Sequence, residues 1–366
     1  MIRHATIALL IAGCYTKPVR PDLGGGGDGG ATDDSIHGDA RVIAENVVFA
    51  TSMHYTASQI TSPTIADQKC ADLASVAQLP GEFRAWVSFS NGPDAIDRLT
   101  GRGWVRADGS PYADMLADIV AGKTFYPPRL DENGTDIFAD QDFVLTGTGA
   151  NGKTTSTDCA NGPGATVTIG TPDATAPFWT DLSTKPCSND LRLYCFGIGR
   201  NVPVTPSVPA GARLAFLTTS VSTSVSPNMD QLCNEEAGVA GLPGTFQAFI
   251  ATASTSAATR VGATPGTEWY RPDGVRVFRA GDPEFLAPLD VLADRSHLGL
   301  MDNGQVFVGA TGPSSLGTAN CNDWNSTAAT SMTSLGDARR SSVGAYFGAT
   351  LATCNTSQRV YCFQSN

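Results

Sequence analysis

The residues of this sequence that are best suited to chemistry are its cysteines, because eight of the nine form two sets of four in the same order. Both sets end in Tyr-Cys-Phe, and their members are Cys70, Cys159, Cys187 and Cys195, then Cys233, Cys321, Cys354 and Cys362. Neither set contains a C-x2-C pair, and His54 and His297 lie at non-equivalent positions, which argues against a zinc site. The pattern predicts a tandem repeat crosslinked by disulfides in an oxidising compartment.

The ninth cysteine, Cys14, follows an apolar run at residues 5–12 and a glycine. This arrangement resembles a bacterial lipoprotein signal, in which the cysteine accepts the lipid and becomes the new N-terminus. We therefore expect a signal peptide at residues 1–13, lipidation of Cys14 and a Gly-rich flexible tether at 14–46. An ordinary signal peptide with an incidental cysteine is the alternative. The prediction places the protein in the bacterial cell envelope, held at the outer membrane or cell surface by lipid only.

The usual signatures of catalysis and metal binding are lacking. No G-x-S-x-G, H-E-x-x-H or G-x-x-x-x-G-K-[ST] segment occurs, so we expect a protein that is not an enzyme and that uses no cofactor or metal. The formal net charge of -11 argues against nucleic acid as a partner. One acidic loop could offer oxygen ligands to calcium, although a solvated loop face is the more ordinary interpretation of Asp131, Glu132, Asp136, Asp140 and Asp142.

The tryptophans divide into two groups by their place in the repeats. Trp104 and Trp269 occupy matched positions, as residues of a shared framework do. Trp179 and Trp324 fall in intervals where the repeats differ in length, and such intervals are typical of surface loops. We therefore expect Trp179 and Trp324 to be the ligand-binding candidates.

Each repeat shows the same order of predicted elements. A strand at 49–52 or 216–219 precedes a helix that begins at Ser62-Pro63 or Ser226-Pro227, a serine cap with proline in the first helical position. Leu-Pro-Gly ends each helix, since proline cannot continue it and glycine permits the turn. An alternating strand follows, at 83–87 or 246–250.

Each repeat resembles bacterial endostatin-like surface lipoproteins, the group that includes the leptospiral endostatin-like proteins. The features that carry the resemblance are the opening strand, the cysteine-bearing helix ending in Leu-Pro-Gly, the Trp-bearing centre and the closing Tyr-Cys-Phe strand. The resemblance implies an α+β fold of two tandem C-type-lectin-like domains, at 47–198 and 213–366, joined by a Pro-rich linker at 199–212. Each domain is expected to contain mixed, mainly antiparallel strands, at least one helix and two nested disulfides.

The disulfide pairing is left open by the spacing, because four cysteines allow three pairings in each repeat. The resemblance implies that the first cysteine pairs with the fourth and the second with the third. The expected bonds are then Cys70–Cys195, Cys159–Cys187, Cys233–Cys362 and Cys321–Cys354. A local bridge between Cys187 and Cys195 is the alternative.

These features together predict a lipid-anchored, non-enzymatic protein whose two lectin-like modules bind an extracellular protein or glycan through their variable loops. Members of the resembling family are implicated in binding host matrix and complement proteins, and only binding in general is expected here. Two alternatives stay open. One is a calcium-independent lectin that binds carbohydrate, and the other is an envelope hydrolase with an unrecognised site.

Overall fold

The computed structural model describes residues 43–366 except for 57–58, 138–141, 156, 158, 160–164, 226–227, 280–288, 291–293, 301–303, 342–343, 345 and 366. The expected signal peptide, Cys14 and nearly all of the expected tether therefore lie outside the described residues. Residues 43–366 form one compact unit. The division of this unit into domains at the linker 199–212 stays a prediction.

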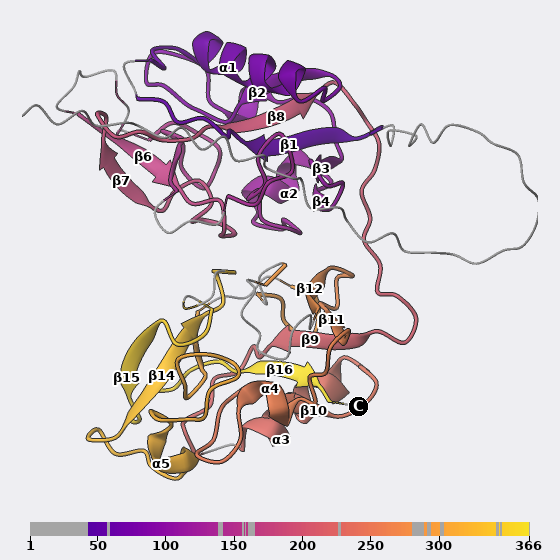
Figure 1. The fold of residues 1–366 in the computed structure, drawn as a ribbon, viewed down its shortest axis with the longest axis vertical. Coiled ribbons are helices and arrows are strands. Elements are labelled where there is room, and N and C mark those ends of the chain that lie inside the picture. Colours follow the sequence, from indigo (N-terminus) through magenta and orange to yellow (C-terminus); the bar gives the residue numbers. More distant parts are fainter. Residues whose placement is uncertain are drawn as a thin grey trace, which may run out of the picture. The chain divides into compact units, whose positions relative to one another are not determined.

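The first repeat is built on a five-stranded sheet in the order β2-β8-β1-β3-β4, in which β1 pairs with β3 in parallel and the other pairs are antiparallel. Its strands are β1 (Asn46–Ala50), β2 (Glu82–Ala85), β3 (Trp104–Arg106), β4 (Pro111–Ala113) and β8 (Tyr194–Ile198). Helix α1 (Pro63–Val76) lies along β2 and β8 (Figure 1). As predicted, Ser62 caps this helix, because its Oγ accepts a hydrogen bond from the Ile65 amide at 3.3 Å.

A second, three-stranded antiparallel sheet completes the first repeat (Figure 1). It runs in the order β5 (Val144–Leu145), β6 (Thr166–Gly170), β7 (Ser183–Pro186). Two short helical segments, η1 (Ile96–Arg98) and α2 (Leu116–Val120), lie between β2 and β5 in the chain.

The second repeat has two sheets of its own, with the same numbers of strands as those of the first. The five-stranded sheet has the order β10-β16-β9-β11-β12 and the other the order β13-β14-β15. The strands are β9 (Arg213–Leu217), β10 (Phe246–Ala248), β11 (Glu268–Tyr270), β12 (Arg276–Arg279), β13 (Gln305–Phe307), β14 (Met332–Asp337), β15 (Thr350–Thr353) and β16 (Tyr361–Gln364); the helices are α3 (Met229–Val239), α4 (Ala257–Arg260) and α5 (Cys321–Trp324). The start predicted for α3 is wrong. Its cap is Asn228, whose side chain accepts from the amides of Asp230 and Gln231, and the expected Ser226-Pro227 cap lies outside the described residues.

Four disulfides crosslink the repeats internally, in the pairing that the resemblance implied. Cys70–Cys195 and Cys233–Cys362 each join the long helix of a repeat to its closing strand. Cys159–Cys187 and Cys321–Cys354 close shorter loops beside the three-stranded sheets, and the local bridge between Cys187 and Cys195 is not formed. Four such bonds fit a secreted or extracellular protein.

The expected fold, two tandem C-type-lectin-like domains, is wrong. The four small sheets form a four-bladed, propeller-like arrangement, with a five-stranded and a three-stranded sheet from each repeat and few helices. The cysteines and closing strands on which the resemblance depended determine which segments are crosslinked. They do not determine how the sheets pack, because packing is decided by apolar faces that lie mostly between the cysteines.

The matched tryptophans are framework residues, as predicted. Trp104 and Trp269 are fully buried. Each donates a hydrogen bond of 2.9 Å from its indole Nε1 to a backbone carbonyl of the closing strand region, at Gly197 and Gln364. The indole N–H of a buried tryptophan needs a partner of this kind.

The two repeats contact each other through equivalent segments. Ala174 and Arg340 form an antiparallel β-bridge, and each follows the last glycine of β6 or β14 by four residues. Arg340 also pairs with Asp173 at 2.9 Å. The buried guanidinium of Arg129 donates to the Leu289 carbonyl at 2.6 Å, and that of Arg295 donates to the Thr124 carbonyl at 2.6 Å. Each repeat therefore inserts an arginine against backbone oxygens of the other.

Candidate functional site

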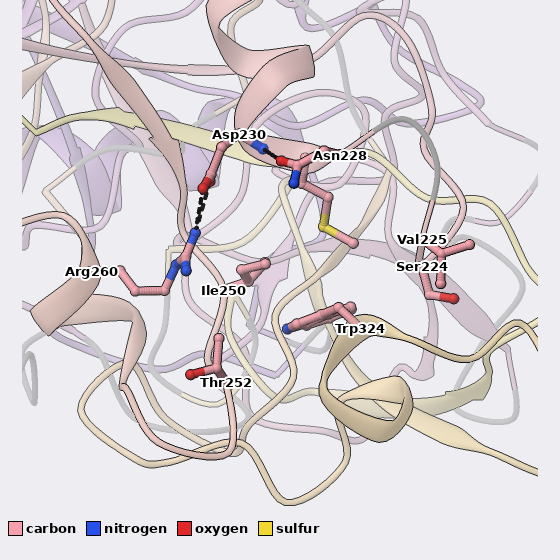
Figure 2. Close-up of a pocket in the computed structure, with 9 residues that line it drawn as sticks. Ser224, Val225, Asn228, Asp230, Ile250, Thr252, Arg260 and Trp324 are labelled. Carbon is pink, nitrogen blue, oxygen red and sulfur yellow. Dashed lines mark hydrogen bonds and ion pairs between the residues drawn. The ribbon is translucent and has the colours of Figure 1, made fainter.

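A pocket of about 150 Å³ opens at the start of α3 in the second repeat. Figure 2 shows its walls, which combine an aromatic ring, an ion pair, aliphatic side chains and short polar groups. The lining residues are Ser224, Val225, Asn228, Met229, Asp230, Ile250, Thr252, Arg260 and Trp324. Such a mixture of apolar surface and a few convergent polar groups is typical of a ligand site.

Trp324 reaches this pocket from a turn with an unusual backbone. Cys321, Asn322, Asp323 and Trp324 have φ of 55°, 54°, 56° and 60°, so α5 is one left-handed turn made of four residues that are not glycine. Left-handed helical geometry costs roughly 1–2 kcal/mol per residue for such side chains. Asparagine and aspartate tolerate it best, which suits the Asn322-Asp323 pair in the middle of the turn.

Several contacts hold the left-handed turn in place. The disulfide Cys321–Cys354 fixes its first residue, and the Asn320 side chain accepts from the Asp323 amide at 3.0 Å. The Asp323 carboxylate in turn accepts from the Ala253 amide at 2.7 Å. The strained conformation is therefore determined by its surroundings rather than by local preference.

The indole of Trp324 is fixed at the pocket wall by a hydrogen bond and by close packing. Its Nε1 donates to the Ala251 carbonyl at 2.9 Å, and the Phe307 ring meets it edge-on at 5.6 Å. A Cβ added at Gly309 would lie 2.7 Å from Trp324 Cζ2, so this position must be glycine for the ring to lie where it does. The ring is partly exposed, which leaves surface available to a ligand.

The ion pair between Asp230 and Arg260 forms the polar wall. Arg260 Nη2 lies 2.8 Å from both carboxylate oxygens of Asp230, and Oδ1 also accepts from the Ala248 amide at 2.8 Å. Among the described residues, Nη1 of Arg260 has no hydrogen-bond partner, and Oδ2 of Asp230 accepts only from Arg260. Both groups thus keep unused hydrogen-bonding capacity.

The first repeat contains the same ion pair in a closed form. Asp67 accepts from the Ala85 amide and pairs with Arg98, as Asp230 does with Ala248 and Arg260. Arg98 Nη1, however, donates to the carbonyls of Ala85 and Val87, and its side chain is only 8% exposed against 21% for Arg260. Both repeats therefore share the ion pair, but only in the second repeat does it line the pocket.

The structure separates the two tryptophans predicted as ligand-binding residues. Trp324 lines the pocket, whereas Trp179 is buried at 2% exposure. Trp179 packs in an aromatic cluster with its ring centroid 5.0 Å from that of Trp86 and 5.4 Å from that of Tyr194. As placed, Trp179 offers no ring face to a ligand. The Trp179 carbonyl lies against Gly170 in the first repeat, and the carbonyl of buried Tyr346 lies against Gly336 in the second. Trp179 therefore occupies a framework position that both repeats share.

The acidic loop is occupied by internal contacts. Asp131 accepts from the amides of Asn133 and Thr135, and Glu132 accepts from the Ser52 amide. Asp136 pairs with Arg129 at 3.0 Å, and Asp142 contacts His54 and Arg192. No cluster of three or more potential metal ligands occurs among the described residues, and Asp140 lies outside them.

The sequence did not predict the pocket residues that α3, α4 and the segment after β10 contribute. Met229, Ile250 and the Asp230–Arg260 pair carried no motif. A signal existed for the ion pair alone, because Asp230 and Arg260 each align with a residue of the same type in the first repeat, Asp67 and Arg98. The greater exposure of Arg260, which makes this pair part of a site, cannot be predicted from the residue types alone.

No protein-family model matches the sequence, and no curated protein matches it significantly. In the described part of the chain, no helix is long and apolar enough to cross a membrane. The pocket itself is therefore the basis for a functional assignment.

Proposed function

We propose that this chain is an exported, lipid-anchored, non-enzymatic binding protein that recognises an extracellular ligand in the Trp324 pocket. The observation that carries the proposal is the left-handed turn, which presents a partly exposed tryptophan at the wall of a mixed polar and apolar pocket. Trp side chains in such settings contribute much of the binding energy of interfaces.

The energetic cost of the turn supports a binding role. Cys321 and Trp324, at roughly 1–2 kcal/mol each, give about 2–4 kcal/mol of unfavourable backbone geometry, and Asn322 and Asp323 add a smaller amount. Strained residues of this kind gather at ligand clamps and active sites, where the surrounding structure holds them. The pocket carries an aromatic ring and an ion pair but, among the described residues, no histidine. Binding explains these groups more simply than catalysis does.

The envelope location rests on Cys14 and on the disulfides. A thiol at this position after a short apolar run is suited to lipid attachment, and the four disulfides fit an oxidising compartment. Replacing Cys14→Ser should move the protein from the membrane fraction to the soluble fraction and abolish labelling with radioactive palmitate. Unchanged membrane retention of the variant would refute lipid anchoring.

Binding is tested with the exported protein on arrays of extracellular glycans and matrix proteins. Trp324→Ala should abolish whatever binding the natural protein shows. Leu351→Ala is the matched control, because Leu351 is a large apolar residue of the same repeat that is 63% exposed and does not line the pocket. Equal binding by the natural protein and by Trp324→Ala would refute the pocket as the recognition site.

A further inference from the structure

We infer that the Trp324 pocket binds one pyranose ring of a neutral saccharide and does so without a metal ion. This inference rests on the proposed function and names its ligand class. It follows from the size of the pocket, from the nature of its aromatic wall and from the unused hydrogen-bonding groups of the Asp230–Arg260 pair.

The size of the pocket limits the ligand to a small group. Its volume of about 150 Å³ is below the roughly 300–1,000 Å³ of sites that enclose a drug-sized molecule. A single ring, such as the terminal sugar of a longer chain, suits this space. The rest of the saccharide would then extend into solvent.

The apolar wall suits one face of a sugar ring. Trp324, Ile250 and Met229 all line the pocket, and Figure 2 shows Trp324 and Ile250 on its wall. The face of an indole ring carries negative charge density and attracts the weakly positive C–H groups that one face of a pyranose presents. A planar anchor held by its own hydrogen bond to Ala251 loses little conformational entropy when the ring stacks on it.

The polar wall suits a pair of neighbouring hydroxyl groups. A hydroxyl both donates and accepts, so two adjacent hydroxyls need a donor and an acceptor side by side. Arg260 Nη1 supplies the donor and Asp230 Oδ2 the acceptor, and both retain capacity among the described residues. An apolar peptide side chain would leave these groups without partners in a partly desolvated site, which is unfavourable.

The charge of the pocket favours a neutral ligand. Asp230 lies 2.8 Å from Arg260 and compensates its charge, and no second cation lines the pocket in the described part of the chain. An acidic sugar would therefore meet no excess positive charge. Since no cluster of potential metal ligands occurs among the described residues, recognition is assigned to the side chains themselves.

The test is isothermal titration of the full exported chain with methyl glycosides of glucose, galactose and mannose, in buffer containing EDTA. At least one should bind. Trp324→Leu, which keeps apolar bulk but loses the ring face, should weaken binding on the order of tenfold, and Trp324→Phe should weaken it less. Arg260→Gln, which removes the charged donor, should also weaken it on the order of tenfold.

Several outcomes would overturn the inference. Equal affinities of Trp324→Leu and Trp324→Phe would exclude ring stacking. Binding of a glycoside only when the titration is repeated without EDTA would exclude metal-free recognition. Binding of a protein ligand that is sensitive to Trp324→Ala, with no response to any glycoside, would overturn the saccharide assignment and leave the proposed function standing. No ligand sensitive to Trp324→Ala on any array would overturn both.

Discussion

The two disulfides that close short loops allow the role of the left-handed turn to be tested with a control inside the same chain. Cys321–Cys354 closes a loop of 33 residues that contains the turn, and Cys159–Cys187 closes a loop of 28 residues in the first repeat. After Cys159 the first repeat reads Ala-Asn-Gly-Pro-Gly, where the second reads Asn-Asp-Trp-Asn-Ser after Cys321. Only one of these loops carries a tryptophan at the pocket.

The expected losses of stability are nearly equal. The chain-entropy model gives about 3.7 kcal/mol for the loop closed by Cys321–Cys354 and about 3.6 kcal/mol for the other. When Cys321–Cys354 is removed, relaxation of the left-handed residues offsets part of this loss of unfolding free energy. The double variant Cys321→Ser/Cys354→Ser should therefore lose no more unfolding free energy than Cys159→Ser/Cys187→Ser.

The expected losses of binding are very different. Without its disulfide the turn can relax, and Trp324 then leaves the position set by Ala251 and Gly309. Ligand affinity should fall at least tenfold in the second-repeat variant and stay within about twofold in the first-repeat variant. Guanidinium chloride unfolding under non-reducing conditions measures the stabilities, and titration measures the affinities. Full affinity in Cys321→Ser/Cys354→Ser, with the fold retained, would refute the argument that this bond holds the site.

Three further predictions concern single residues. Gly309→Ala combines a φ of +79° with a contact of 2.7 Å to Trp324, so it should displace the ring and abolish binding; a crystal structure of the variant with Trp324 unmoved would contradict this. Trp179→Ala should destabilise the fold by about 3–5 kcal/mol but leave the affinity of the folded protein unchanged, and a specific loss of affinity would instead restore Trp179 as a site residue. Burial opposes ionisation of Asp108, but Arg106 and Ser110 outweigh it and hold the pKa of Asp108 below its ordinary value. The stability that this shift contributes is present above the unfolded-state pKa and is lost as the pH falls through the folded-state pKa. Asp108→Asn should therefore destabilise the protein at neutral pH and flatten the fall in melting temperature below about pH 4. An unchanged dependence of the melting temperature on acid pH would contradict this prediction.

The sequence predicted those parts of the structure that local chemistry determines. The Ser62-Pro63 start of α1 follows from the capping oxygen and the fixed φ of proline, and the burial of Trp104 and Trp269 follows from their matched positions. The disulfide pairing was implied by the resemblance and is the one formed. These features depend on short-range geometry or on residues that recur in both repeats.

The remaining features depend on packing between distant segments. The propeller-like arrangement of the four sheets is decided by apolar contacts along the whole chain, so the cysteine pattern did not predict it. Trp179 lies in an interval that differs in length between the repeats, yet its ring fills the core. Trp324 was predicted as a surface residue, but the left-handed geometry of the turn that carries it arises from contacts of Asp323 with Asn320 and Ala253.

The bridge between Ala174 and Arg340 has a consequence for how the two halves can change. A contact made by the same segment of both partners is what two identical subunits form about a twofold axis. In such a symmetric pair every substitution is present twice, so a costly feature such as a left-handed turn is borne by both subunits. Joining the copies in one chain removes that constraint. One half can then specialise in recognition while its counterpart keeps the sheet framework and the shared contact.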